Sequence, residues 1–271
     1  MIIKLPDPIG DAIALREAME SIQVGCLGFY NDNCETIYKD LVARRNYYDI
    51  NIYDLKSSRK FKTNINLIEA FKDIILCNQD LFYNIKNKYE LEEESVDLPG
   101  QFIACDIWAN WAEKRPNPDK LINTLYKIRD KSNLPLIFLG AYVKDASGEM
   151  RGERKYDVID LVGKTNIKQI IYIIKRASLY IGPDSGLMRF ATYFNINSLI
   201  ISMSTTPEWT RNKNYLSADL PCIGCYNRGI VGIKENSSPR CPYKIKCSNE
   251  WNEDLLIEKS LFLLKEKETI K

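Results

Sequence analysis

The chain of 271 residues contains no histidine. Imidazole-based acid–base catalysis, histidine metal ligands and Ser-His or Cys-His nucleophile pairs are therefore excluded. No apolar run approaches the roughly 18 to 20 residues of a membrane span, and the first residues reach Pro6-Asp7-Pro8 too soon for a signal-peptide core. We therefore expect a cytoplasmic protein, in which cysteines are more often free thiols or metal ligands than disulfides.

Other signatures are also missing. No Gly-x-Gly-x-x-Gly occurs, which argues against dinucleotide dehydrogenases, and Gly163-Lys164-Thr165 is not a P-loop because Val158 stands where that motif needs glycine. The formal net charge of +2 is spread along the chain, so we expect no nucleic-acid partner. With 45% hydrophobic and 27% charged residues, the composition is typical of a soluble globular protein large enough for two modest domains.

Strand and helix patterns alternate along the chain, which predicts parallel α/β units. We expect a smaller N-terminal domain over residues 1–98, with a helix over 34–44. A clearer C-terminal domain is expected over 99–250, after the turn signal Leu98-Pro99-Gly100. Apolar spacing over 252–267 predicts a C-terminal helix.

The most informative segment runs from Ala177 to Ser204. It predicts an apolar strand, a tight Gly-Pro-Asp-Ser-Gly turn, a helix that opens at Ser185, and a second apolar strand. The first N–H groups of such a helix have no partner within the helix, and the helix dipole favours an anion there. The first ligand to consider is therefore a diphosphate, as found in a nucleotide.

The residues also resemble a known family. Asp184-Ser185-Gly186, two apolar residues, a polar residue and an alanine-containing helix are similar to the nucleotide-sugar signature of lipopolysaccharide heptosyltransferases, family 9 of the glycosyltransferases. The stretch from Asp160 to Thr165 resembles the preceding family segment, and Gly10-Asp11 resembles its N-terminal motif. The resemblance is best over residues 102–206, and it implies a GT-B fold: two Rossmann-like domains around a central cleft, here with the N-terminal domain reduced. In that fold the C-terminal helix, within residues 251–271, would pack back on the N-terminal domain.

The resemblance implies a role for several residues, each of which also has a plainer interpretation. Asp11, after Gly10, would be the general base; the plainer interpretation is that it only caps the following helix. Lys114, with Arg115, would neutralise the sugar-linked phosphate, although a loop lysine could simply be solvated. Arg189 stands where the family usually has histidine, and it would still donate to the diphosphate. The remaining implied donor-binding residues are Lys164, Thr165, Asp184, Ser185 and Gly186.

Four cysteines lie in a loop over residues 221–248 that is rich in Gly, Asn and Pro: Cys222, Cys225, Cys241 and Cys247. A Cys-x-x-Cys pair followed by two more thiols can close around a tetrahedral metal. We favour structural zinc, with iron as a further candidate; reduced free thiols or disulfides are the alternatives.

Taken together, the sequence predicts an inverting glycosyltransferase that needs no metal for catalysis, since no Asp-x-Asp occurs at a strand end. By resemblance, the donor is ADP-heptose or a related nucleotide sugar. The acceptor is a glycan or lipid-linked glycan such as a lipooligosaccharide core, with a protein less favoured; peripheral contact with the inner membrane and oligomerisation are compatible with this role. The alternatives are a GT-B-like enzyme with another donor, and a non-catalytic or assembly subunit that binds nucleotide sugar.

Overall fold

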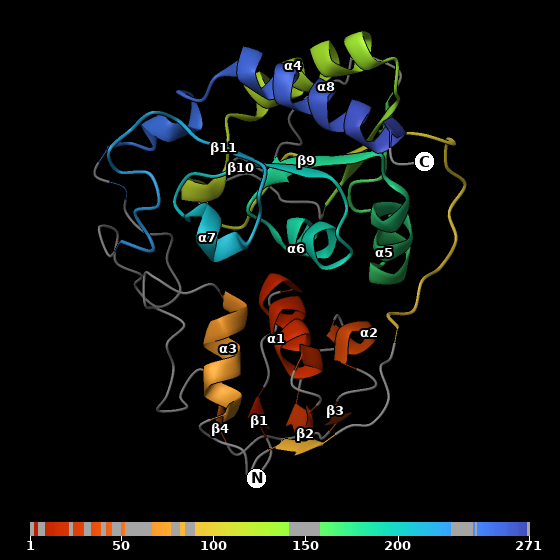
Figure 1. Cartoon of the computed structure of the whole chain (residues 1–271), viewed down its shortest axis with the longest axis vertical. Helices are drawn as coiled ribbons and strands as arrows, with labels where there is room; N and C mark the ends of the chain where they lie inside the picture. Colours follow the sequence, from red (N-terminus) through yellow and green to blue (C-terminus); the bar gives the residue numbers. More distant parts are fainter. Residues whose placement is uncertain are drawn as a thin grey trace.

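The computed structural model describes residues 3–4, 9–21, 24–29, 34–38, 42–44, 50–51, 67–76, 82–84, 90–140, 158–228, 241 and 243–269. Two α/β units are stacked along the long axis of the molecule (Figure 1). Each is built on its own sheet, one of five strands and one of six.

The N-terminal sheet has the order β3-β2-β1-β4 in parallel, with β5 added antiparallel to β2. Its strands are β1 (Ile3–Lys4), β2 (Val24–Phe29), β3 (Val42–Arg44), β4 (Ile50–Asn51) and β5 (Phe82–Asn84). Its helices are α1 (Ile9–Ser21), α2 (Glu35–Tyr38) and α3 (Leu67–Leu76). The helix expected over 34–44 is therefore wrong at its end: α2 stops at Tyr38, and residues 42–44 pair with β2.

The C-terminal sheet is entirely parallel, in the order β11-β10-β9-β6-β7-β8. Its strands are β6 (Ile103–Asp106), β7 (Leu136–Leu139), β8 (Ile159–Asp160), β9 (Leu179–Pro183), β10 (Ser198–Ile201) and β11 (Tyr215–Leu216). The accompanying helices are η4 (Ala112–Lys114), α4 (Pro118–Ser132), α5 (Ile167–Arg176), α6 (Gly186–Tyr193), α7 (Pro207–Thr210), η5 (Lys246–Ser248) and α8 (Glu253–Thr269). The central strands β6, β7, β9 and β10 are buried along their length, as expected when helices cover both faces.

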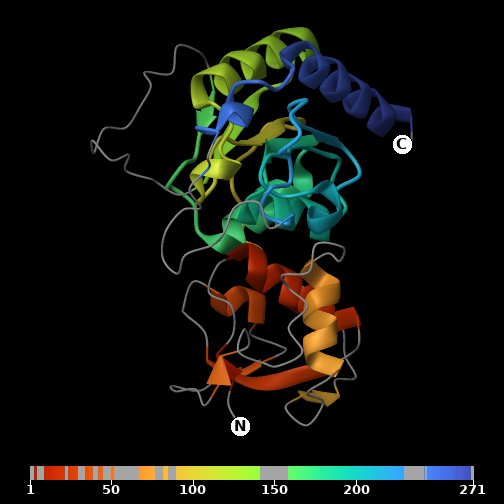
Figure 2. The same cartoon turned by 90° about the vertical axis from the view of Figure 1, so that its left-hand side faces the viewer.

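Helices α4 and α8 cover one face of this sheet, while α5 and α6 cover the other (Figure 2). The C-terminal helix differs from our expectation. Instead of packing across the N-terminal domain, α8 packs on α4, β9 and β10. The physical reason is that Leu256, Ile257 and Leu263 join the apolar core formed by α4 and the sheet.

Residues 90–98, an acidic segment between the two domains, run along α5 (Figure 1). Glu93 accepts bonds from Arg176, and Lys175 lies close to it. Leu91 and Val96 pack on the core that includes α5. The acidic side chain of Glu93 therefore binds this segment to the basic C-terminal end of α5, at Lys175 and Arg176.

The two units meet at α1, which packs on α6 and shares one continuous apolar core with it. Polar bonds flank this contact. The Arg16 guanidinium, fully buried, lies 2.8 Å from Glu20, and Glu20 accepts a 2.8 Å bond from the Tyr193 hydroxyl. Arg211 reaches Glu17 at 2.8 Å. The carboxyl ends of the C-terminal strands are thereby held next to the N-terminal domain.

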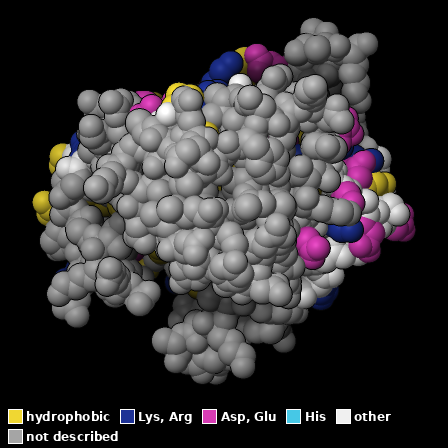
Figure 3. Space-filling model, turned by 90° about the horizontal axis from the view of Figure 1, so that it is seen from below, with side chains coloured by type: hydrophobic (Ala, Val, Ile, Leu, Met, Phe, Trp, Pro, Cys, Tyr) yellow, Lys and Arg dark blue, Asp and Glu magenta, His cyan; other side chains and the backbone are white. Residues whose placement is uncertain are grey.

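Within the described residues, no helix combines the length and apolar character that crossing a membrane would need. Seen from below, the described acidic and basic side chains are intermingled along one rim (Figure 3).

Candidate functional site

The turn between β9 and α6 forms as the sequence predicted. Ser185 caps α6, with its Oγ accepting the Met188 N–H at 3.3 Å. An α-helix cannot pair its first N–H groups internally, so the N–H groups of Gly186 and Leu187 remain for a ligand. Together with the helix dipole, they form a place that favours an anion.

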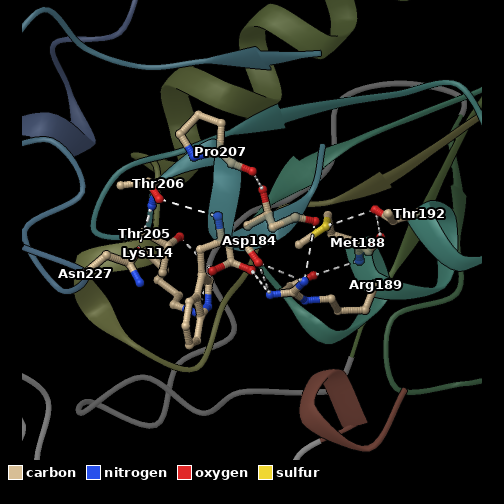
Figure 4. Close-up of polar contacts among 12 residues, drawn as sticks. Lys114, Asp184, Met188, Arg189, Thr192, Thr205, Thr206, Pro207 and Asn227 are labelled. Atoms are coloured by element: carbon tan, nitrogen blue, oxygen red, sulfur yellow. Dashed lines mark hydrogen bonds and ion pairs between the residues drawn. The ribbon is translucent and has the colours of Figure 1, made fainter. Parts of the chain in front are cut away.

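Asp184, just before this helix, is surrounded by donors from three different segments (Figure 4). Lys114 Nζ lies 2.7 Å from its Oδ2, the Thr205 hydroxyl donates to the same oxygen at 2.7 Å, and Arg189 Nη2 lies 4.0 Å from Oδ1. Burial alone would raise the pKa of Asp184, which is 4% exposed, but the Lys114 and Arg189 charges hold it below its ordinary value. Two cations against one carboxylate leave a net positive charge beside the helix start, which suits a phosphate.

Arg189 is itself held in place. Its guanidinium donates to the carbonyls of Trp209 and Thr210 at 3.4 Å, so it joins α6 to α7 (Figure 4). A permanent charge in a buried and bonded position can act on a ligand without reorganising.

Asp106 ends β6 on the other side of this turn and is 3% exposed. Its Oδ1 accepts the Trp108 N–H at 2.9 Å, and the Ser185 and Tyr180 side chains also bond to the carboxyl group. Burial raises its pKa to about 7, although these bonds work in the opposite direction. A second carboxyl group, only partly ionised near neutral pH, therefore supports the cap of α6.

The loop after β6 positions Lys114 through η4. Arg115 bonds the carbonyls of Ala109 and Asn110 and stacks over Trp108, with its guanidinium 4.1 Å from the ring centroid. Its bonds therefore hold the loop itself, whereas Lys114 points to Asp184. Of the two predicted cations, Lys114 is the one the fold brings to the turn.

Asp11 lies in the first turn of α1, where the helix dipole favours a carboxylate, and it is half-buried. The helix begins at Ile9, so Asp11 is inside the helix and is not its N-cap. Tyr226 connects it with the donor turn, since burial and the charges of Asp11 and Asp184 all raise the pKa of this phenol. Both carboxylates are thus within electrostatic reach of one side chain.

Lys164 and Thr165 lie elsewhere on the same sheet edge. Lys164 Nζ bonds the Asp160 carbonyl at 2.9 Å, and Asn166, not Thr165, caps α5 in a capping box with Gln169. They follow β8, which is separated from β9 by two strands, or about 14 Å at the usual strand spacing. The fold does not join them to the Lys114–Asp184 pair, but both groups border the carboxyl edge of one sheet.

The four loop cysteines line a single pocket as free thiols, and no disulfide joins them. Burial, together with the neighbouring thiols, raises the pKa of Cys225 to about 11 and that of Cys247 to about 12. Glu113 also lines the pocket, and its buried Oε2 bonds to no described group. Within the described ranges, however, no three potential ligands are already arranged to hold an ion.

This cysteine pocket backs onto the Asp184 site. Glu113 lines the pocket and precedes Lys114, Cys225 lines it and precedes Tyr226, and Met203 lines it two residues before Thr205. Backbone hydrogen bonds from the Gly224 N–H to the Met203 carbonyl (2.7 Å) and from the Tyr226 N–H to the Ser204 carbonyl (2.9 Å) join the two loop segments.

Sequence reasoning missed three residues of the site: Asp106, Thr205 and Tyr226. Asp106 had a usable signal, since a polar residue that ends an apolar strand lies at the ligand-binding edge of an open α/β sheet. Thr205 carries the same signal less clearly, since it is a polar residue that follows the apolar strand β10 only after several positions. Tyr226 gave none, because its place depends on how the cysteine loop folds back.

Comparison with known proteins agrees with this geometry. Residues 125–230 match the model of glycosyltransferase family 9 (heptosyltransferase), a span that includes α6 and Asp184 but not Asp11 or Lys114. No curated protein sequence matches the chain.

Solved structures match nearly the whole chain. The iron-containing dodecameric glycosyltransferase TibC from enterotoxigenic Escherichia coli has a TM-score of 0.76 at 12% identity, covering 98% of this chain and 76% of TibC. A family 9 glycosyltransferase from Veillonella parvula gives 0.62 at 12% identity, over 98% and 97%. The E. coli ADP-heptose lipopolysaccharide heptosyltransferase II gives 0.57 at 12% identity, over 98% and 99%. These matches confirm the resemblance to family 9 over residues 125–230 and the GT-B fold of the chain.

Proposed function

We propose that this protein transfers a heptose-like sugar from a nucleoside diphosphate, with inversion, to a glycan acceptor such as a lipooligosaccharide core. The observation that carries the proposal is the turn at Asp184, where the partly buried Lys114 and the buried Arg189 meet the start of α6. TibC has also been solved with ADP-D-β-D-heptose, which supports that nucleotide sugar as the first donor to test.

The mechanism is a single displacement. Asp11 takes the proton of the acceptor hydroxyl, and the oxygen attacks the anomeric carbon from the side opposite the diphosphate. The bond between that carbon and the phosphate oxygen breaks. Lys114, Arg189 and the N–H groups of Gly186 and Leu187 stabilise the charge that develops on the leaving diphosphate, so no catalytic metal is required.

The cysteine pocket has a separate role in this proposal. Its four thiols fit zinc or iron, and the unbonded Glu113 Oε2 leaves polar capacity in the pocket. Cys222, Cys225, Cys241 and Cys247 would hold the ion, which would fix the loop that carries Tyr226. Metal analysis of protein purified without chelators tests this, and less than about half an equivalent would count against it.

The cellular setting is also part of the proposal. We place the protein in the cytoplasm, in peripheral contact with the inner membrane when the acceptor is lipid-linked, and we include self-association. Fractionation of expressing cells and measurement of the mass in solution test these points.

The decisive experiment measures binding and turnover separately. Wild-type protein should bind ADP and ADP-heptose in calorimetry and transfer heptose to a heptose-deficient core oligosaccharide. Asp11→Asn should keep ADP affinity and lose transfer by about 100-fold or more, the usual size of a general-base contribution. Glu35→Gln, an exposed first-turn carboxyl of α2, is the matched control. Binding without turnover in the wild type would favour a non-catalytic subunit, and no binding would refute the donor site.

A further inference from the structure

We infer that Tyr226 contacts the transferred sugar and helps to select it, with its phenol hydrogen-bonded to a sugar hydroxyl and Trp111 forming the adjoining wall. The inference rests on the proposed function and extends it. It starts from a geometric requirement: in a single displacement, the sugar lies between the leaving diphosphate and the acceptor hydroxyl. A side chain that faces both the donor turn and the base therefore borders the sugar.

Tyr226 meets this requirement on the donor side through direct packing. Its ring centroid lies 5.1 Å from that of Trp111, edge to face. Lys114 Nζ lies 4.8 Å from the centroid of the same Trp111 ring and 2.7 Å from Asp184. Tyr226 is thus one side chain removed from the cation that we assign to the diphosphate.

The base side is reached across the contact between the two domains. Tyr226 packs against the apolar core that α1 and α6 share, and Asp11 lies in the first turn of α1. A phenol hydroxyl can donate a hydrogen bond to a sugar oxygen.

The surrounding chain fixes this ring in place. Trp209 packs on its other side, with ring centroids 6.0 Å apart, and the Tyr226 N–H bonds the Ser204 carbonyl. The next residue, Asn227, accepts the Thr206 N–H at 2.9 Å (Figure 4). A half-buried phenol held from three directions can discriminate between hydroxyl positions, because a misplaced sugar hydroxyl would leave it unpaired.

The test compares two probes that differ only in the sugar. Calorimetry with ADP and with ADP-D-β-D-heptose is run on wild type, on Tyr226→Phe and on the matched control Tyr193→Phe, whose hydroxyl bonds Glu20 at the domain contact. We expect Tyr226→Phe to keep ADP affinity within about twofold and to weaken ADP-heptose binding about 3- to 10-fold, the range for one neutral hydrogen bond. Tyr193→Phe should show no such selective loss.

Each other outcome has a distinct meaning. Equal weakening of both probes would make Tyr226 a structural support of the phosphate turn, and unchanged binding of both would remove it from the sugar; either result overturns the inference alone. If wild-type protein bound neither probe, the proposed function would fail and this inference with it.

Discussion

The buried carboxyl group of Asp106 makes a strong prediction about pH and stability. Its pKa is raised from 3.8 to about 7, chiefly by burial. The folded protein therefore keeps a proton that the unfolded chain has already lost between about pH 4 and pH 7. Its contribution to stability is fully present below pH 4 and is lost as the pH rises through 7.

The size of the effect follows from the shift. About three pKa units at 1.36 kcal/mol each amount to about 4 kcal/mol, an order-of-magnitude figure. Asp106→Asn keeps the shape and removes the titration. Its stability relative to wild type should therefore increase by about 1.4 kcal/mol per pH unit between pH 5 and 7, and level off above pH 7.

Urea denaturation of both proteins at pH 5, 6, 7 and 8 measures this difference. Asp119→Asn, which removes an exposed carboxyl group in the first turn of α4, is the matched control. If the Asp106→Asn difference changes no more across the series than the Asp119→Asn difference, the Asp106 carboxyl group does not carry the proton as the structure implies.

Three further predictions concern the cation, a glycine and the domain contact. Lys114→Met should weaken ADP binding in calorimetry about 10- to 100-fold, since a charged hydrogen bond is worth about 1.5 to 3 kcal/mol. Gly224→Ala should lower the free energy of unfolding by about 1 to 3 kcal/mol, because Gly224 has φ +74° and a Cβ there would lie 2.5 Å from Thr206 Cγ2. Arg16→Met should cost about 3 to 5 kcal/mol in denaturant unfolding, because it leaves Glu20 without its buried partner.

Each of these has a control in the same chain. Arg211→Met removes a half-exposed guanidinium bonded to Glu17 and should change ADP affinity little. Gly100→Ala should be nearly neutral, since a Cβ there meets nothing within 4 Å. Lys127→Ala breaks an exposed ion pair with Glu253 and should cost less than about 1 kcal/mol. Equal effects in variant and control would contradict the assigned contacts.

The sequence by itself determined the local elements of the donor side. The strand, the turn, the Ser185 cap and the start of α6 follow from residues within a few positions of one another, so neighbouring side chains and backbone dictate them. The same holds for α3 and α5, whose bounds agree with their apolar patterns. The helix predicted over residues 34–44 extends too far, because the local pattern does not reveal that residues 42–44 form a strand paired with β2.

Only the tertiary structure decided which distant residues meet. The Lys114–Asp184 pair spans 70 positions, and it forms because β6 and β9 are neighbours in the sheet. Tyr226 reaches the site because the backbone of the cysteine loop bonds to residues 203–204. Helix α8 lies on its own domain because its apolar residues pack in the core formed by α4 and the sheet. Strand order and the shared core of α1 and α6 depend on packing between segments far apart in sequence, which no local pattern encodes.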